Sequence, residues 1–315
     1  MDSANFFSST MLGVSGRLLA GLWGALWGSF FCLVIVRLPA EESIVRPSSH
    51  CRNCHAPIAW YDNIPLLSYL LLGGRCRQCK AHFSCRYFIV ELLVCGLALA
   101  LHQVYVVGGT AAIELRLAQF VITSLFCGIL VTVAFIDFDT LRIPDVITYP
   151  GIPIAALLSL FMGHLHLWDG LVGALAGYLV IRLIADGYQF FTGRMGMGYG
   201  DAKLLAMIGG LLGWQVLLPV LFLASFQGTV IGISVLVKTR GRRKDTLPRG
   251  SNELDADQQP LADIADETRP KENEEEELPA ESLRYARIPF GPFLSLAAIE
   301  LLLLKDFLLF MFPFG

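Results

Sequence analysis

The sequence predicts an all-α polytopic membrane protein with about eight transmembrane helices. Two observations carry this prediction: 55% of the 315 residues are hydrophobic, and only 16% are charged. Soluble domains average about 45–50% apolar and about 25% charged residues, so both figures are displaced toward a chain that lies in lipid. The net charge of −3 offers no basic surface overall, and we expect no nucleic-acid partner.

Apolar runs long enough to cross a lipid bilayer recur along the chain. A hydrocarbon core about 30 Å thick requires roughly 20 apolar residues in a helix. The stretch 202–237 is too long for one span, so we divide it near Trp214, with a turn at Gly213. No basic segment precedes the first run, which we therefore interpret as a span and not as a cleaved signal peptide. The other predicted spans lie at about 17–36, 88–107, 117–136, 146–162, 171–191 and 290–312.

Basic residues assign the loops to the two faces of the membrane. The loop 37–87 carries seven Lys and Arg residues, and five more follow the seventh span at 238–244. The loops 108–116 and 163–170 carry one and none. Because Lys and Arg accumulate in cytoplasmic loops, we expect the two basic segments in the cytoplasm and both termini on the opposite side.

The small net charge conceals an acidic segment in a basic protein. Residues 245–281 contain 13 of the 27 acids but only 3 of the 24 bases. We expect 238–287 to be a basic and then acidic disordered cytoplasmic insert, because it has too little apolar surface to fold alone. The other expected parts are an N-terminal segment with helix one at 1–37, a cytoplasmic loop at 38–87, helices two to seven at 88–237, and helix eight at 288–315.

Two CxxC pairs in the first cytoplasmic loop have the pattern of a metal site. Such turns direct their thiolates to one ion, and two turns complete a tetrahedron around zinc. Four protein ligands leave no open coordination position, so this metal would organise the loop without catalysing a reaction. The four cysteines, with 21 residues between the pairs, are Cys51, Cys54, Cys76 and Cys79.

The same loop leaves other interpretations open. His55, His82 or Cys85 could replace one of the four ligands. Redox-active pairs and two disulfides are the alternatives to a metal, although the reducing cytoplasm disfavours disulfides.

Two acidic motifs lie where predicted helices reach the cytoplasmic face. Asp137 and Asp139 end the third span, and Gly198-Tyr-Gly200-Asp201 precedes the sixth. Ionisable side chains are costly in a membrane and usually mark a functional site. If Asp137 and Asp201 meet, they can share a proton, so that one activates water and the other protonates a scissile carbonyl. Solvated loop acids and an ion-coupled transporter are the alternatives.

These motifs belong to an ordered series that covers the chain except its extreme N-terminus and about 240–285. In this series the chain resembles the bacterial type IV prepilin peptidases, the bifunctional leader peptidase and N-methyltransferase family. The motifs that carry the resemblance are Gly28-Ser29-Phe30, Arg37-Leu38-Pro39, the two CxxC pairs, Ser84-Cys-Arg86-Tyr87 through Glu91, Ile136-Asp137, Ile143-Pro144-Asp145, Gly198-Tyr-Gly200-Asp201 and Ile288-Pro289-Phe290-Gly291.

The resemblance implies a GxGD-type aspartyl endopeptidase of the bacterial inner membrane, with its active site facing the cytoplasm. It implies cleavage of type IV prepilins or type II secretion pseudopilins after a glycine, then N-methylation of the new N-terminal residue with S-adenosylmethionine. It also implies that Asp137 and Asp201 are catalytic, with Asp139 as the rival of Asp137, and that the four cysteines bind structural zinc.

One departure from the family pattern affects the methyl transfer. Cys32 stands where the family usually has asparagine after its Gly-Ser-Phe motif, so a peptidase without methyltransferase activity is an alternative. The retained cysteine loop favours methyl transfer, because relatives that only cleave often lack it. A non-catalytic zinc scaffold is a further alternative. We also expect acidic side chains to guide the basic leader, with Asp139, Asp145 and Glu91 as candidates.

Overall fold

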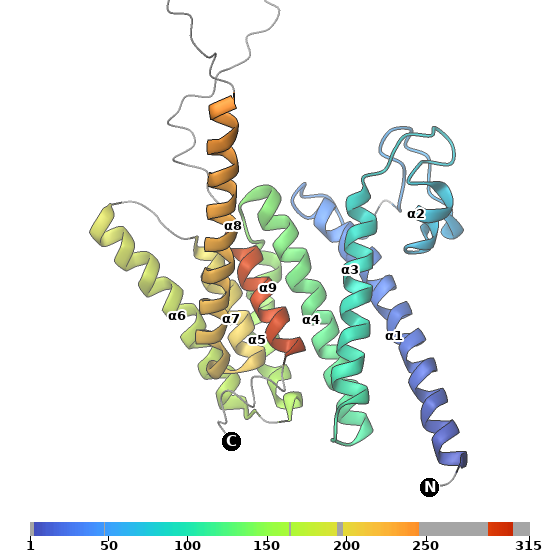
Figure 1. The fold of residues 1–315 in the computed structure, drawn as a ribbon, viewed down its shortest axis with the longest axis horizontal. Helices are drawn as coiled ribbons and strands as arrows, with labels where there is room; N and C mark the ends of the chain where they lie inside the picture. The colour runs from blue at the N-terminus through green and yellow to red at the C-terminus, as the bar shows by residue number, and fades with distance from the viewer. Residues whose placement is uncertain (1–2, 47, 164, 194–197, 246–288, 305–315) are drawn as a thin grey trace, which may run out of the picture. The chain divides into compact units, whose positions relative to one another are not determined.

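The protein is helical throughout the part that the structure describes, as predicted. The computed structural model describes residues 3–46, 48–163, 165–193, 198–245 and 289–304, and no strand forms within them. The helices are α1 (Ser3–Arg37), α2 (Leu67–Leu72), α3 (Cys85–Leu101), α4 (Ile113–Thr140), α5 (Asp145–Leu158), α6 (Leu167–Thr192), α7 (Tyr199–Leu212), α8 (Leu217–Asp245) and α9 (Gly291–Leu303) (Figure 1).

Six helical segments within the described ranges are long and apolar enough to cross a membrane, so the prediction of a multi-pass protein is confirmed. The other two predicted spans are shorter: α7 has 14 residues and α9 has 13 up to Leu303. The chain turns at Gly213, with a φ of 85°, as predicted. The six segments are Gly13–Arg37, Cys85–Val107, Ile113–Thr140, Asp145–Met162, Leu167–Thr192 and Trp214–Val235.

The C-terminal parts of the sequence prediction are described only partly. Helix α8 continues through the basic residues at 238–245, so helical structure extends eight residues beyond the predicted end of the seventh span. The rest of the predicted disordered insert, 246–288, and the end of the last predicted span, 305–315, lie outside the described residues. Two compact units divide the chain, Met1–Gly228 with Pro289–Gly315 and Thr229–Ile288, and the contacts below belong to the first.

The short helix α7 lies in the centre of its neighbours. It packs against α5, α6 and α9, and side chains around its whole circumference are buried, including Leu204, Leu205 and Ile208. A helix that is apolar on all faces belongs in a core. Glycines allow this close packing: a Cβ on Gly173 of α6 would overlap the carbonyl of Gly209 of α7, and the converse also holds.

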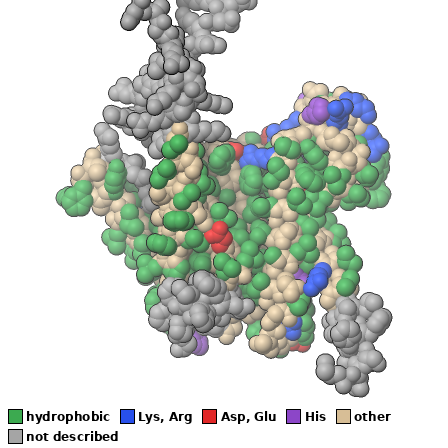
Figure 2. Space-filling view, in the orientation of Figure 1, with side chains coloured by type: hydrophobic (Ala, Val, Ile, Leu, Met, Phe, Trp, Pro, Cys, Tyr) green, Lys and Arg blue, Asp and Glu red, His purple; other side chains and the backbone are tan. Residues whose placement is uncertain are grey.

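A second group of helices packs around α1 and α3. A Cβ on Gly24 of α1 would lie 2.8 Å from the Cα of Cys95, and one on Gly28 would lie 2.9 Å from the Cα of Glu91. Helix α4 contacts α1, α3 and α9, so it joins this pair to the helices around α7. Figure 2 shows hydrophobic side chains over the helices and Lys and Arg side chains gathered on the loop between α1 and α3.

The glycine crossing of α6 and α7 predicts a position-specific loss of stability. Replacing Gly173 by alanine should cost about 1–3 kcal/mol, because the new methyl group forces the two backbones apart. Gly187 is the matched control, since it lies on the same helix with nothing within 4 Å of the position of its Cβ. Thermal unfolding in detergent micelles should show a lower Tm for Gly173→Ala alone. Equal Tm values would contradict this account of the crossing.

Candidate functional site

The loop between α1 and α3 gathers four cysteines into one cluster. The Sγ atoms of Cys51, Cys54, Cys76 and Cys79 all lie within 4.8 Å of one another. Two of the Sγ–Sγ distances are 3.7 Å (Cys51 to Cys79) and 4.0 Å (Cys54 to Cys76), and all eight cysteines of the chain are free. Thiolates at about 2.3 Å from a tetrahedral zinc ion lie roughly 3.8 Å apart. The cluster therefore fits a metal ion, and the disulfide alternative is wrong.

Two equivalent turns build this cluster. In the first turn, the backbone N–H of Cys51 donates to the carbonyl of Ala56, and the N–H of His55 donates to the carbonyl of Cys51. In the second turn, the N–H of Cys76 donates to the carbonyl of Ala81, and the N–H of Lys80 donates to the carbonyl of Cys76. The residue after the second cysteine of each turn has a positive φ, 55° at His55 and 60° at Lys80. The three alternative ligands do not join the cluster: His55, His82 and Cys85.

Hydrogen bonds within the loop favour the thiolate form, which binds metals, at two of the four cysteines. The backbone N–H of Ala81 and the side-chain amide of Asn53 lower the pKa of the Cys79 thiol to about 6. The backbone N–H groups of Cys54 and Asn53 lower the pKa of Cys51 as well. A thiol must lose its proton to become a ligand, so these donors assist metal binding.

The two acidic motifs meet although 64 residues separate Asp137 from Asp201. Asp137 lies in the last turn of α4 and is 5% exposed, and Asp201 lies in the first turn of α7 and is 7% exposed. The two carboxylates are close enough for the charge of Asp137 to act on Asp201. The sequence prediction that these two acids lie together is therefore consistent with the structure.

A third motif completes the surroundings of Asp137. The backbone N–H of Gly291, at the start of α9, donates a 3.1 Å hydrogen bond to Oδ2 of Asp137. Ile143 lies between this motif and the glycines before Asp201: a Cβ on Gly291 would lie 3.1 Å from Ile143 Cδ1, and one on Gly200 would lie 3.0 Å from Ile143 Cβ. Only glycine therefore fits at 200 and 291, where Ile143 packs directly against the backbone.

Asp139, the rival of Asp137, has a different partner. Its carboxylate forms a 2.5 Å ion pair with Arg86, at the start of α3. The same guanidinium donates a 3.1 Å hydrogen bond to the carbonyl of Phe135 and lies over the ring of Phe135. Arg86 thus holds the turn of α4 on both sides of Asp137. Sequence reasoning missed this role, although an arginine at the start of an apolar helix is a signal that a partner must exist.

The three acids expected to guide a basic leader are already engaged within the protein. Asp139 pairs with Arg86, and Asp145 forms a 2.5 Å ion pair with Lys203 of α7. Glu91 accepts a 2.7 Å hydrogen bond from the backbone N–H of Leu66. Ion pairing leaves little free negative charge at two of the positions, so the geometry does not favour this guiding role.

The cysteine cluster predicts metal binding that depends on its four thiols alone. The purified protein should hold one ion per chain after dialysis, and Cys76→Ala should abolish this, because three ligands bind far more weakly than four. Cys85→Ala is the matched control, since Cys85 lies in the same segment but outside the cluster. Elemental analysis of both variants measures the outcome. Loss of the metal in Cys85→Ala would show that the ligand set is wrong.

Two family models match this chain, one over the cysteine loop and the other over the two aspartates. Residues 22–105, which include the four cysteines, match the model of the bacterial peptidase A24 N-terminal domain. Residues 124–233, which include both aspartates, match the model of the type IV leader peptidase family. No solved structure matches the chain.

Curated relatives cover most of the chain. A prepilin leader peptidase/N-methyltransferase of Myxococcus xanthus is 37% identical over 95% of this chain and 94% of its own length. Proteins of the same description from Aeromonas hydrophila and Neisseria gonorrhoeae are 40% and 34% identical over 74% and 71% of this chain, and over 85% and 83% of their own lengths. With both family models matched and relatives of this extent, the chain belongs to the type IV leader peptidase family.

Proposed function

We propose that the protein is an aspartyl endopeptidase of the GxGD type, with Asp137 and Asp201 as its catalytic pair. Its substrates are type IV prepilins or type II secretion pseudopilins, whose leaders it cleaves after a glycine on the cytoplasmic side of the inner membrane. The observation that carries this proposal is the meeting of two buried carboxylates from α4 and α7 beside two glycines, one of which donates its backbone N–H to Asp137.

The geometry suits general acid–base hydrolysis of a peptide bond. Two carboxylates in such a site hold one proton between them, because two charges so close are costly. The ionised carboxylate takes a proton from water as the water oxygen attacks the scissile carbonyl carbon, and the other carboxyl group protonates the carbonyl oxygen. When the C–N bond breaks, a proton returned from the pair leaves with the new amine. The Gly291 N–H holds Asp137 in place.

The basic residues of the cysteine loop support the proposed orientation. They lie at the end of the molecule where α1 ends and α3 begins, and Arg86 joins this end to the last turn of α4 beside Asp137. Since basic loops stay in the cytoplasm, the catalytic pair faces the cytoplasm as well. In this arrangement α7 and the helix that starts at Gly291 complete eight membrane-embedded helices, and zinc is the metal of the four-thiolate site.

The proposed function includes a second reaction. The relatives described as N-methyltransferases cover both halves of the chain, and the cysteine loop is present and well formed. We therefore assign to this protein N-methylation of the amine that cleavage exposes, with S-adenosylmethionine as the methyl donor. The methyl group moves to the nitrogen and leaves the donor as a thioether.

The catalytic pair can be tested by removing one carboxylate at a time. Asp137→Asn and Asp201→Asn should each lower kcat for leader cleavage by at least about a hundredfold, because an amide cannot exchange the required protons. Asp186→Asn, on the exposed side of α6, should cleave normally. The assay uses a membrane-inserted prepilin and measures bound metal in parallel. Full cleavage by either variant would remove that residue from the pair, and loss in both with the metal retained would exclude a scaffold role.

Gly291 provides a second test that leaves both carboxylates intact. A Cβ at this position would lie 2.5 Å from Oδ2 of Asp137, so Gly291→Ala should displace the carboxylate and lower kcat by about a hundredfold. Gly96→Ala in α3 is the matched control, because nothing lies within 4 Å of that position. Unchanged cleavage by Gly291→Ala would show that the contact between α9 and Asp137 has no part in catalysis.

A further inference from the structure

Helix α2, in the cysteine loop, presents its apolar side chains to the outside. It lies in the stretch 63–74, which contains no charged residue. Leu67, Leu70 and Leu71 are exposed and form one leucine face, because side chains three and four residues apart lie on the same side of a helix. Ser68, by contrast, is buried, and its hydroxyl donates to a backbone carbonyl. This polarity is the reverse of that of a surface helix in water.

The contacts of α2 place it beside the first two turns of α3, which is a membrane-length helix (Figure 1). The ring of Tyr69 stacks on that of Phe88, with 5.2 Å between the centroids, and the N–H of Leu66 donates a 2.7 Å hydrogen bond to Glu91. Glu91 lies about 9 Å along the helix axis from Cys85, the first residue of α3. Helical side chains lean toward the N-terminus, so the start of α2 lies between these two levels.

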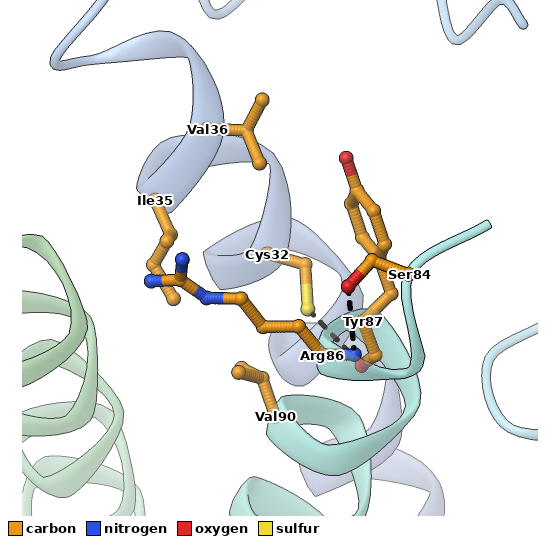
Figure 3. A pocket seen from close by; sticks show the side chains of 7 residues that line it. All are labelled: Cys32, Ile35, Val36, Ser84, Arg86, Tyr87 and Val90. Carbon is orange, nitrogen blue, oxygen red and sulfur yellow. Dashed lines mark hydrogen bonds between the residues drawn. The ribbon is translucent and has the colours of Figure 1, made fainter. Parts of the chain in front are cut away.

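The lipid-facing surface of the bundle begins at the same level. The end of α1 and the start of α3 lie side by side there, and aliphatic side chains of both line a small hollow between them (Figure 3). These side chains are Ile35, Val36 and Val90. On α3, Ile89 and Leu92 are exposed within the membrane-length segment. The leucine face of α2 therefore lies at a depth where the neighbouring helix already presents apolar side chains to lipid.

An ion pair and two aromatic side chains lie where the apolar stretch begins and ends. Arg77 donates hydrogen bonds of 2.7 Å and 2.6 Å to the carboxylate of Asp62, and its guanidinium lies over the ring of Tyr61. Trp60, the preceding residue, is exposed. Trp and Tyr gather at the boundary between lipid and water, where an amphipathic ring meets both media. The base of the stretch thus has the composition of a membrane interface.

The backbone of the stretch finds hydrogen-bond acceptors within the protein. The N–H groups of residues 66–68, 70 and 73–75 all donate to protein oxygens. A segment in contact with hydrocarbon must satisfy its backbone groups internally, because no water is present to do so. At these seven positions the stretch meets that requirement.

We propose that the stretch 63–74 inserts into the leaflet at the face where α1 ends and α3 begins. The leucine face contacts the acyl chains, and Trp60 and the pair of Asp62 with Arg77 lie at the level of the headgroups. Charge complementarity supports lipid as the occupant, because the loop 37–87 carries seven Lys and Arg residues against three acids, and anionic headgroups attract such loops. The insertion holds the four-cysteine cluster against the membrane surface.

Photolabelling of the full-length protein from within the bilayer tests this insertion. The protein is placed in nanodiscs of phosphatidylethanolamine and phosphatidylglycerol that contain a phospholipid with a diazirine on its acyl chain. Peptide mapping should find label on 66–72 within about threefold of that on 88–93 of α3, because both contact acyl chains. The first cysteine turn, 51–57, is the internal control and should stay unlabelled. Label on 88–93 without label on 66–72 would overturn the proposal.

The same samples distinguish lipid from a protein partner. Hydroxyl-radical footprinting should find 66–72 protected in nanodiscs before any substrate is added. Protection that appears only after a prepilin is added would identify a protein-docking surface in place of a lipid contact, and would also overturn the proposal.

A matched pair of substitutions measures the insertion through stability. Leu71 and Val45 belong to the same loop and are 77% and 78% exposed, but Val45 has charged neighbours at 42 and 46. If both faced water, Leu71→Asp and Val45→Asp would be equally mild. A carboxylate in lipid is costly, so Leu71→Asp alone should lower Tm and reduce the label on 66–72 by at least about threefold. Equal behaviour of the two variants would contradict the insertion, and the wild-type labelling decides the question if Leu71→Asp does not fold.

Discussion

The burial of two carboxylates at helix ends is the constraint on which the rest of the structure depends. Asp137 and Asp201 are almost fully removed from solvent, and desolvation of charged groups is costly unless hydrogen bonds compensate for it. The first N–H groups of a helix have no acceptor within that helix and carry a partial positive charge. Gly291 is the first residue of α9, and its N–H binds Asp137. The hydrogen bond to Asp137 of α4 therefore fixes the position of the start of α9.

Close backbone packing follows from this requirement. The N–H of Gly291 reaches Asp137 only because residue 291 has no side chain: a Cβ there would lie 2.5 Å from Oδ2 of Asp137. Ile143 occupies the rest of the space that a Cβ on Gly200 or Gly291 would need. Helix α7 carries Asp201 into the interior through its glycine crossing with α6. Membrane helices use small residues in this way because the lipid supplies no hydrophobic force that drives helices together. Glycines thus serve both the packing of the helices and the approach of a backbone N–H to Asp137.

The sequence predicted those features whose signal is local. Hydropathy located six membrane-length helices, and the spacing of the CxxC pairs identified the four cysteines that the structure brings together. It also placed the turn between α7 and α8 at Gly213. The contacts of Arg86 with Asp139 and of Gly291 with Asp137 were not predictable, because 53 and 154 residues separate the partners. No periodicity or short motif encodes which distant segments meet, so the positions of the six membrane-length helices were easier to predict than the partners of each charge.

Arg86 shows how the two halves of the chain are joined. It belongs to the half that matches the N-terminal domain, yet its guanidinium holds the turn of α4 that carries Asp137. Its remaining donor, Nε, is buried and has no hydrogen-bond partner among the described residues. Because a guanidinium is rigid and planar, a shift of the start of α3 also moves the group that holds Asp139 and Phe135. The half of the chain that carries the cysteine loop therefore also positions the turn of α4 that bears one carboxylate of the proposed peptidase site.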